Sequence, residues 1–239
     1  RVSQWMTRED LFTQSFVLPY LVPMLENAGA NVLLPRERDT QLNEIIIDND
    51  EGVDATSYSE TDGSEKWGDT GAGFAHKKNV YSTGENPFRD GTARSVKSVT
   101  GGRESRAEWR AAIPEEGEYA VYVSYASFGP DSSDEAIYTV RHRGGETRFA
   151  VNQTMGGGMW VYLGSFEFAA GEERTLVTLT NACGEAGRIV SADAVKIGGG
   201  YGNIAREVSP ALRSDEIDYE AVTSEYPRFC EGARYWLQW

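Results

Sequence analysis

The chain changes its hydrophobic pattern near residue 44, where one long apolar segment gives way to many short alternating ones. Between residues 11 and 25 the apolar side chains fall on nearly every side of a helix, which is typical of a buried helix. Pro19 and Pro23 should kink or divide this helix, because proline removes a backbone donor and clashes with the preceding turn. Gly29 is placed to end it, and residues 31–34 form a short apolar strand. A helix followed by a buried strand predicts half of an α/β unit.

Beyond residue 44 the sequence consists of short β-type segments separated by glycine-rich or acidic turns. Residues 107–111 and 119–126 alternate between the two faces of a strand, and Trp109 and Trp160 are predicted to lie in the core of such strands. Further strands are predicted at Glu44–Ile47, Ala136–His142, Thr147–Val151, Met159–Phe168, Thr175–Thr180 and Arg188–Ile197. Roughly eight strands at this spacing predict a mainly β protein, an antiparallel β-sandwich of the jelly-roll kind.

These patterns divide the chain into three parts. Residues 1–43 are a partial α/β segment, residues 44–206 are the β-sandwich, and residues 207–239 form a mixed, acidic return segment. The predicted strand at 31–34 has no obvious partners among the later segments, and the sequence neither begins with Met nor ends on polar residues. We therefore expect the sequence to be a piece of a longer protein.

Charge and composition exclude several classes of function. The chain has 37 acidic and 23 basic residues, a net charge of -14, so a phosphate backbone would be repelled and no nucleic acid partner is expected. No apolar run approaches the roughly 20 residues of a membrane span. Cys183 and Cys230 are too few for a disulfide framework, and His76 and His142 are too few for a multi-histidine metal site.

Four blocks between residues 80 and 206 carry a family resemblance. Together and in their order they resemble the golvesin / xanthan-lyase carbohydrate-binding-like domain; the blocks are Val80–Arg94, Gly117–Ala126, Ala136–Phe168 and Val190–Arg206. The resemblance implies a β-sandwich of galactose-binding-like, jelly-roll form. It also implies a non-catalytic module that binds carbohydrate or cell wall, or that serves as a spacer.

The flanks resemble a different family. Thr13–Gln41 looks like the helix, strand and Arg-x-x-Asp turn of zinc-dependent N-acetylmuramoyl-L-alanine amidases, with Arg36 and Asp39 at the turn. Arg228–Trp239 looks like the point where such a protein resumes its amidase-like domain after an inserted sandwich. This arrangement resembles large secreted Bacteroidetes proteins labelled xanthan lyase. The zinc-binding motifs of those amidases are absent here, so the chain itself is expected to be inert as a hydrolase.

Three functions stay open on this basis. The first is a non-catalytic module of a secreted, periplasmic or cell-surface protein, with a polysaccharide or peptidoglycan as partner. The second is part of a cell-wall hydrolase or polysaccharide lyase whose catalytic residues lie outside this chain. The third is a structural insert without a ligand.

Candidate sugar-binding residues follow from the chemistry of sugars. Because a sugar ring has apolar faces and polar edges, its site needs an exposed aromatic ring beside a few polar groups. Tyr125, Phe128 and Asp131 share one predicted loop, and loops on a rigid sandwich often carry function. Trp67 and Asn152 are further candidates.

One acidic turn is a candidate calcium site. Asp48, Asp50 and Asp54 place oxygen ligands near one another in a turn that also contains Gly52, as a hard cation prefers. The turn lacks the bidentate glutamate that closes an EF-hand loop, and the sequence favours a solvated turn after the strand at 44–47 over a calcium site. No other cofactor is expected.

Overall fold

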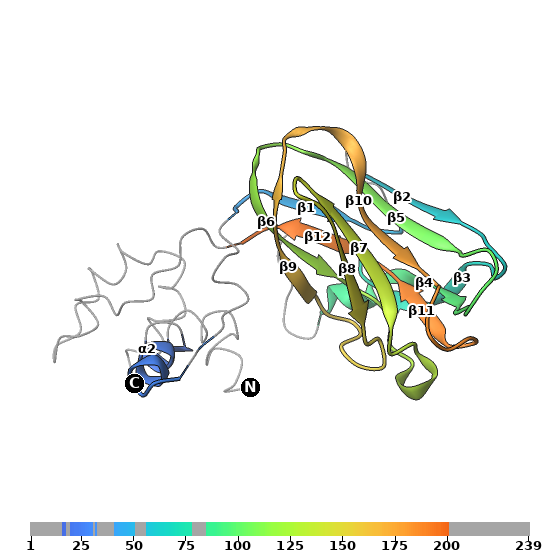
Figure 1. Ribbon diagram of the computed structural model, residues 1–239, viewed down its shortest axis with the longest axis horizontal. Helices are drawn as coiled ribbons and strands as arrows, with labels where there is room; N and C mark the ends of the chain where they lie inside the picture. The colour runs from blue at the N-terminus through green and yellow to red at the C-terminus, as the bar shows by residue number, and fades with distance from the viewer. Residues whose placement is uncertain are drawn as a thin grey trace. The chain divides into compact units, whose positions relative to one another are not determined.

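The computed structural model describes residues 16–17, 20–30, 32, 41–50, 56–77 and 85–200 (Figure 1). The chain forms two compact units, residues 1–34 with 203–239 and residues 35–202. Of the sequence predictions, Asp54, Arg36, Asp39, Cys230 and the return segment at 207–239 lie outside the described residues.

The described part of the first unit contains the short helix α2 (Val22–Asn27). Pro23 lies in its first turn, directly after residues 20–21, which are π-helical, so the helical segment changes its hydrogen-bonding pattern at the position where the proline lacks an N–H. Gly29 has a φ of 88° and donates its N–H to the Glu26 carbonyl at 2.9 Å, which confirms the predicted stop. Val22 is buried but Met24 is 68% exposed, so the prediction of a helix buried on all sides is wrong here. Apolar residues bury only where another layer covers them.

Within the described residues, no helix has the length and apolar character that a membrane crossing requires.

The second unit consists of strands in three antiparallel sheets (Figure 1). Their order is β1-β12-β6-β9, β2-β5-β10-β7-β8 and β11-β4-β3. The bounds are β1 (Glu44–Ile47), β2 (Thr56–Thr61), β3 (Gly68–Gly73), β4 (Gly91–Lys97), β5 (Arg106–Ile113), β6 (Gly117–Val123), β7 (Ala136–His142), β8 (Gly145–Val151), β9 (Val161–Phe168), β10 (Gly171–Thr180), β11 (Ile189–Ala192) and β12 (Val195–Gly198). The predicted mainly antiparallel β-sandwich is confirmed.

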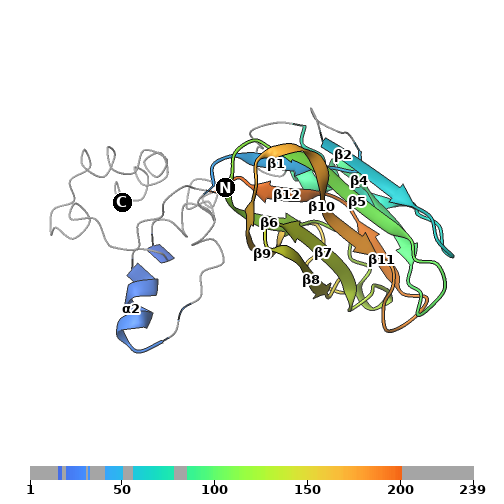
Figure 2. The same cartoon turned by 45° about the horizontal axis from the view of Figure 1, so that its top comes forward.

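The core lies between the four-stranded and five-stranded sheets, whose strands are seen from a second direction in Figure 2. Alternate residues of β6 and β12, such as Val121 and Ile197, meet alternate residues of β5 and β7 there. Trp109 of β5 is fully buried, with its ring 5.4 Å from that of Tyr58 and 6.2 Å from that of Tyr138, which confirms its predicted core position. Trp160 differs: it is only half-buried and lies outside this core.

Candidate functional site

The outer face of the four-stranded sheet carries a row of large side chains. Ile46 of β1 pairs with Lys196 of β12, Lys196 pairs with Tyr122 of β6, and Tyr122 pairs with Tyr162 of β9. Directly paired residues of antiparallel strands project from the same face, so the four side chains form one row. Ile47 and the other alternate residues of these strands face the core, which places the row on the opposite, outer side. Lys196 is only 7% exposed, and its Nζ lies 4.5 Å from the centre of the Tyr122 ring.

Three rings lie beside this row. Phe74 follows β3, Phe88 belongs to the 3-10 helix η4 (Pro87–Arg89), and Trp160 precedes β9. The Trp160 ring centre lies 4.8 Å from that of Phe74 and 5.4 Å from that of Phe88, and 5.9 Å from Lys196 Nζ. This aromatic cluster therefore explains why Lys196 is buried although it is on the outer face of a sheet.

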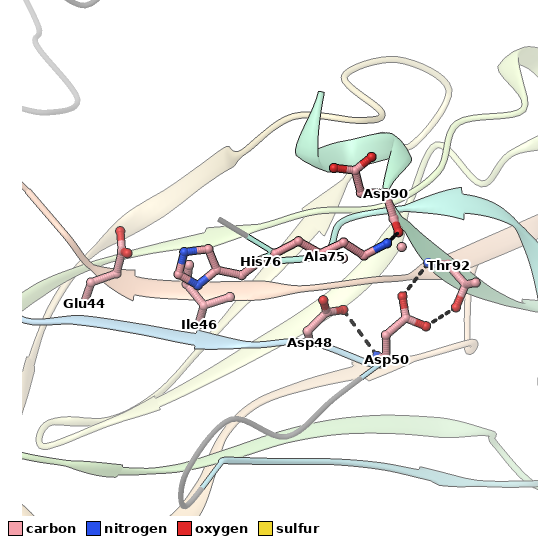
Figure 3. Close-up of a pocket in the computed structure, with 10 residues that line it drawn as sticks. Glu44, Ile46, Asp48, Asp50, Ala75, His76, Asp90 and Thr92 are labelled. Atoms are coloured by element: carbon pink, nitrogen blue, oxygen red, sulfur yellow. Dashed lines mark hydrogen bonds between the residues drawn. The ribbon is translucent and has the colours of Figure 1, made fainter. Parts of the chain in front are cut away.

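A cavity of about 640 Å³ opens at the β1 end of the row, and we call it the β1 cavity (Figure 3). Its lining consists of Glu44, Ile46, Asp48, Asp50, Ala75, His76, Lys77, Asp90, Gly91 and Thr92. Glu44, Ile46 and Asp48 alternate along the chain and so project to the same side of the strand. Figure 3 shows them rising from β1 toward the segment that carries Ala75 and His76, which forms the facing wall.

Hydrogen bonds from β4 and from the chain after β3 fix this wall. Asp50 accepts hydrogen bonds from both the backbone N–H and the hydroxyl of Thr92. Deeper in the sandwich, Asp193 is 1% exposed and accepts the Phe74 N–H at 3.0 Å and the Ser124 hydroxyl at 2.6 Å. Asp193 thus joins the end of β6, the end of β3 and the start of β12 in one network.

The burial of two carboxyls changes their acidity. Burial, followed by the negative charge of Asp193, raises the pKa of Asp48 to about 7. Burial also raises the pKa of Asp193 to about 6, although the hydrogen bonds from Ser124 and Phe74 favour its ionised form. The floor of the cavity therefore carries a carboxyl that gains or loses its proton near neutral pH.

These two pKa values predict that the free energy of unfolding falls as pH rises from about 4 to about 8. Both exceed the ordinary value of 3.8, so the folded state holds protons that the unfolded state has released. Asp48→Asn removes the charge and should raise the free energy of unfolding by about 1 to 2 kcal/mol at pH 8, with almost no change near pH 4. Urea unfolding of both proteins at the two pH values measures this. An equal gain at pH 4 and pH 8 would contradict it.

The comparison with known proteins identifies the sandwich. Residues 53–199, more than half of the chain, match the family model of the Golvesin C-terminal domain. The chain belongs to this family. Over 161 residues the chain is 31% identical to the xanthan lyase of Bacillus sp. (strain GL1). This alignment covers 66% of this chain but only 15% of that relative's length.

Two solved structures are similar to the golvesin domain. One is a Paenibacillus xanthan lyase, 21% identical with a TM-score of 0.45, which covers 66% of this chain and 13% of that chain. The other is a carbohydrate binding module from Cellvibrio mixtus lichenase 5A, solved with cellotriose. It is 16% identical with a TM-score of 0.35, and the match covers 62% of this chain and 98% of that chain.

Two of the three aromatic residues predicted to bind sugar, Tyr125 and Trp67, are buried in the structure. Tyr125 is 2% exposed, because it continues the inward alternation of β6, and its hydroxyl donates to the Met155 carbonyl at 2.8 Å. Trp67 is 8% exposed and belongs to the hydrophobic core. Both rings are therefore packed where a ligand cannot stack on them.

The remaining sugar-site candidates are accessible but lie away from the cavity. Phe128 is half-buried, Asp131 is exposed, and Asn152 is exposed with its side-chain oxygen accepting the Thr154 N–H at 3.0 Å. None of these three lines the β1 cavity. Their role in binding stays a prediction.

The predicted calcium ligands are engaged differently in the structure. Asp50 is held by Thr92, and Asp48 Oδ1 accepts a long hydrogen bond of 3.4 Å from the Asp50 N–H. Among the described residues no group of three His, Cys, Asp or Glu side chains is arranged to hold a metal ion. Asp48 and Asp50, found through the calcium pattern, instead line the β1 cavity.

Proposed function

We propose that the β-sandwich of this chain, which includes β1 and the golvesin match at residues 53–199, is a carbohydrate-binding module of a polysaccharide-active protein. We further propose that the glycan binds in the β1 cavity. The observation that carries the proposal is the cavity itself. Its volume of about 640 Å³ falls within the range of about 300–1,000 Å³ of small-ligand sites. Its lining combines the aliphatic side chains of Ile46 and Ala75 with carboxylates and the Thr92 hydroxyl.

This mixture suits a sugar ring. The apolar face of the ring packs against Ile46 and Ala75, while hydroxyls at its edge donate to carboxylate oxygens. Asp90 and Glu44 lie at the rim with carboxylates that accept no hydrogen bond from a described residue. They are free to accept such donors from a ligand.

The wider setting is also part of the proposal. The golvesin domain spans 15% of the length of a relative named xanthan lyase, so it fits a small part of a large protein that acts on a polysaccharide. We propose a secreted or cell-surface protein, with a polysaccharide or peptidoglycan as partner. We further propose that any catalytic residues of a hydrolase or lyase lie outside this chain, because residues 13–41 resemble an amidase segment while the zinc-binding motifs of those amidases are absent from the sequence.

Filling the cavity should abolish glycan binding. Ile46→Phe adds a ring to the cavity floor while keeping a residue that favours a strand, so we expect at least a tenfold loss of affinity. Affinity electrophoresis in gels containing soluble polysaccharides, including xanthan and glucans, measures the loss. A parallel incubation of the chain with each polysaccharide in solution is assayed for released product, which would appear only if the chain itself were an enzyme.

The matched control is Ile137→Phe. Ile137 lines a second cavity of about 340 Å³ together with Val99 and Cys183, so the same substitution is made at a different opening. It should leave affinity unchanged. If Ile137→Phe abolishes binding and Ile46→Phe does not, the glycan binds in the second cavity. If the unmodified chain is retained by no polysaccharide, the proposed function is wrong.

A further inference from the structure

The β1 cavity is lined mainly by acidic groups. Among the described lining residues four are acidic (Glu44, Asp48, Asp50 and Asp90) and two are basic (His76 and Lys77), and the whole chain has a net charge of -14. The Lys77 ammonium already donates to the Asp90 carbonyl oxygen. An anionic ligand would meet like charge in this cavity, whereas a cationic group would be attracted to it.

Among these carboxylates, that of Asp48 has no ion pair with a described cation. The residue is 7% exposed, and its side chain accepts hydrogen bonds from the neighbouring backbone N–H groups of Asn49 and Asp50, the latter at 3.4 Å. Asp50, in contrast, is fully engaged by Thr92. Figure 3 shows the Asp48 carboxylate pointing away from β1 toward the wall that carries Ala75.

A buried carboxylate without an ion pair is costly unless a cation or another donor reaches it. Within the described residues no ion pair joins Asp48 to a cation. The charges of Asp193 and Asp50 that act on it are negative, Lys77 donates to the Asp90 carbonyl oxygen, and Lys196 lies over the Tyr122 ring. The raised pKa of Asp48 expresses this cost, which a bound cation would reduce.

We infer that the β1 cavity receives a protonated amine of its ligand, that Asp48 accepts it, and that the ligand is therefore a glycan with free amino groups. The inference rests on the proposed function and narrows its substrate class. An ammonium supplies both the missing charge and up to three N–H donors, which a hydroxyl does not. Asp48 is then the residue that gives the site a higher affinity for amino sugars than for neutral or acidic sugars.

The test compares four hexasaccharides by titration calorimetry with the full chain at pH 7. The probes are β-1,4-linked glucosamine, its fully N-acetylated form, β-1,4-linked glucose and galacturonate. We expect the glucosamine hexamer to bind about tenfold more tightly than the two neutral ones, and galacturonate to bind least. Asp48→Asn should lose this tenfold advantage while changing the affinity for the neutral hexamers by less than about twofold.

The control variant is Glu172→Gln, which removes one negative charge from an exposed position of β10 outside the cavity. It should keep the preference for the glucosamine hexamer. If it weakens glucosamine binding as much as Asp48→Asn does, the attraction is only that of an acidic protein, and the inference is overturned.

The failures of the two proposals are distinguishable. Equal affinity for glucose and glucosamine hexamers, or the tightest binding to galacturonate, overturns the inference and leaves carbohydrate binding intact. Binding to no hexamer and to no polysaccharide of the panel overturns both. Thermal unfolding of each variant ensures that a loss of affinity is not a loss of fold.

Discussion

Replacing Asp193 with alanine is expected to lower the free energy of unfolding by about 3 kcal/mol at pH 7. The substitution leaves the Phe74 N–H and the Ser124 hydroxyl without an acceptor in a region where Asp193 itself is 1% exposed. Each buried donor left unpaired costs about 1 to 3 kcal/mol, and the relief of a buried charge offsets part of the sum. Urea unfolding followed by tryptophan fluorescence measures the loss.

The matched control for this prediction is Asp131→Ala. Asp131 is exposed, so its truncation should change the free energy of unfolding by less than about 0.5 kcal/mol. Equal stability of Asp193→Ala and Asp131→Ala would show that the network around Asp193 contributes nothing. Asp193→Asn should fall between the two, because its amide keeps one acceptor oxygen but turns N–H groups toward the remaining donor.

Asp193 also explains the main difference between the predicted and observed strands. The alternation over residues 188–197 predicts one strand, but the structure has β11 and β12 in different sheets, with Asp193 and Ala194 between them. From the local sequence alone, Asp193 is compatible with a single continuous strand, because nothing in that sequence shows which groups its carboxylate binds. The hydrogen bonds of Asp193 come from residues 119 and 69 positions away in the sequence, so no local pattern predicts them.

Other strands escaped prediction for lack of an apolar face. β2 is polar and β3 is glycine-rich, and each is the edge strand of its sheet. They are strands because they pair with a neighbouring strand, not because their residues have a high β-propensity. The long alternating strands, such as β5 and β7, coincide with the predicted ones because one face of each is buried in the core.

The candidate site was predictable only in part. The alternation of Glu44, Ile46 and Asp48 on one strand places polar and aliphatic groups on a common face, and this is visible in the sequence. The opposite wall, residues 75–77 and 90–92, is brought there by long-range pairing. For Tyr125 the sequence supports two predictions, a strand position from the alternation over residues 119–126 and a loop position beside Phe128. The structure agrees with the alternation, because Tyr125 continues the inward face of β6.

Gly91→Ala is expected to lower the free energy of unfolding by about 3 kcal/mol and to abolish glycan binding. A Cβ at Gly91 would lie 1.9 Å from the Phe74 carbonyl oxygen and 2.5 Å from Asp50 Oδ2. The beginning of β4 would therefore have to move away from the chain after β3. Gly91 pairs with Gly73, whose own Cβ would lie 2.4 Å from the Thr92 carbonyl oxygen, so neither strand can yield independently. Because Gly91 and Thr92 line the β1 cavity, this movement displaces its wall.

Gly68→Ala is the control within the same strand pair. Gly68 lies in β3, and a Cβ there meets no heavy atom within 4 Å, so the variant should be as stable as the unmodified chain or slightly more stable. Its glycan affinity should be unchanged. Urea unfolding and affinity electrophoresis of the two variants, side by side, separate the close approach at Gly91 from any general effect of removing a glycine. If both variants bind and unfold alike, the wall at Gly91 is not the tight contact that the structure describes, and the glycan does not depend on it.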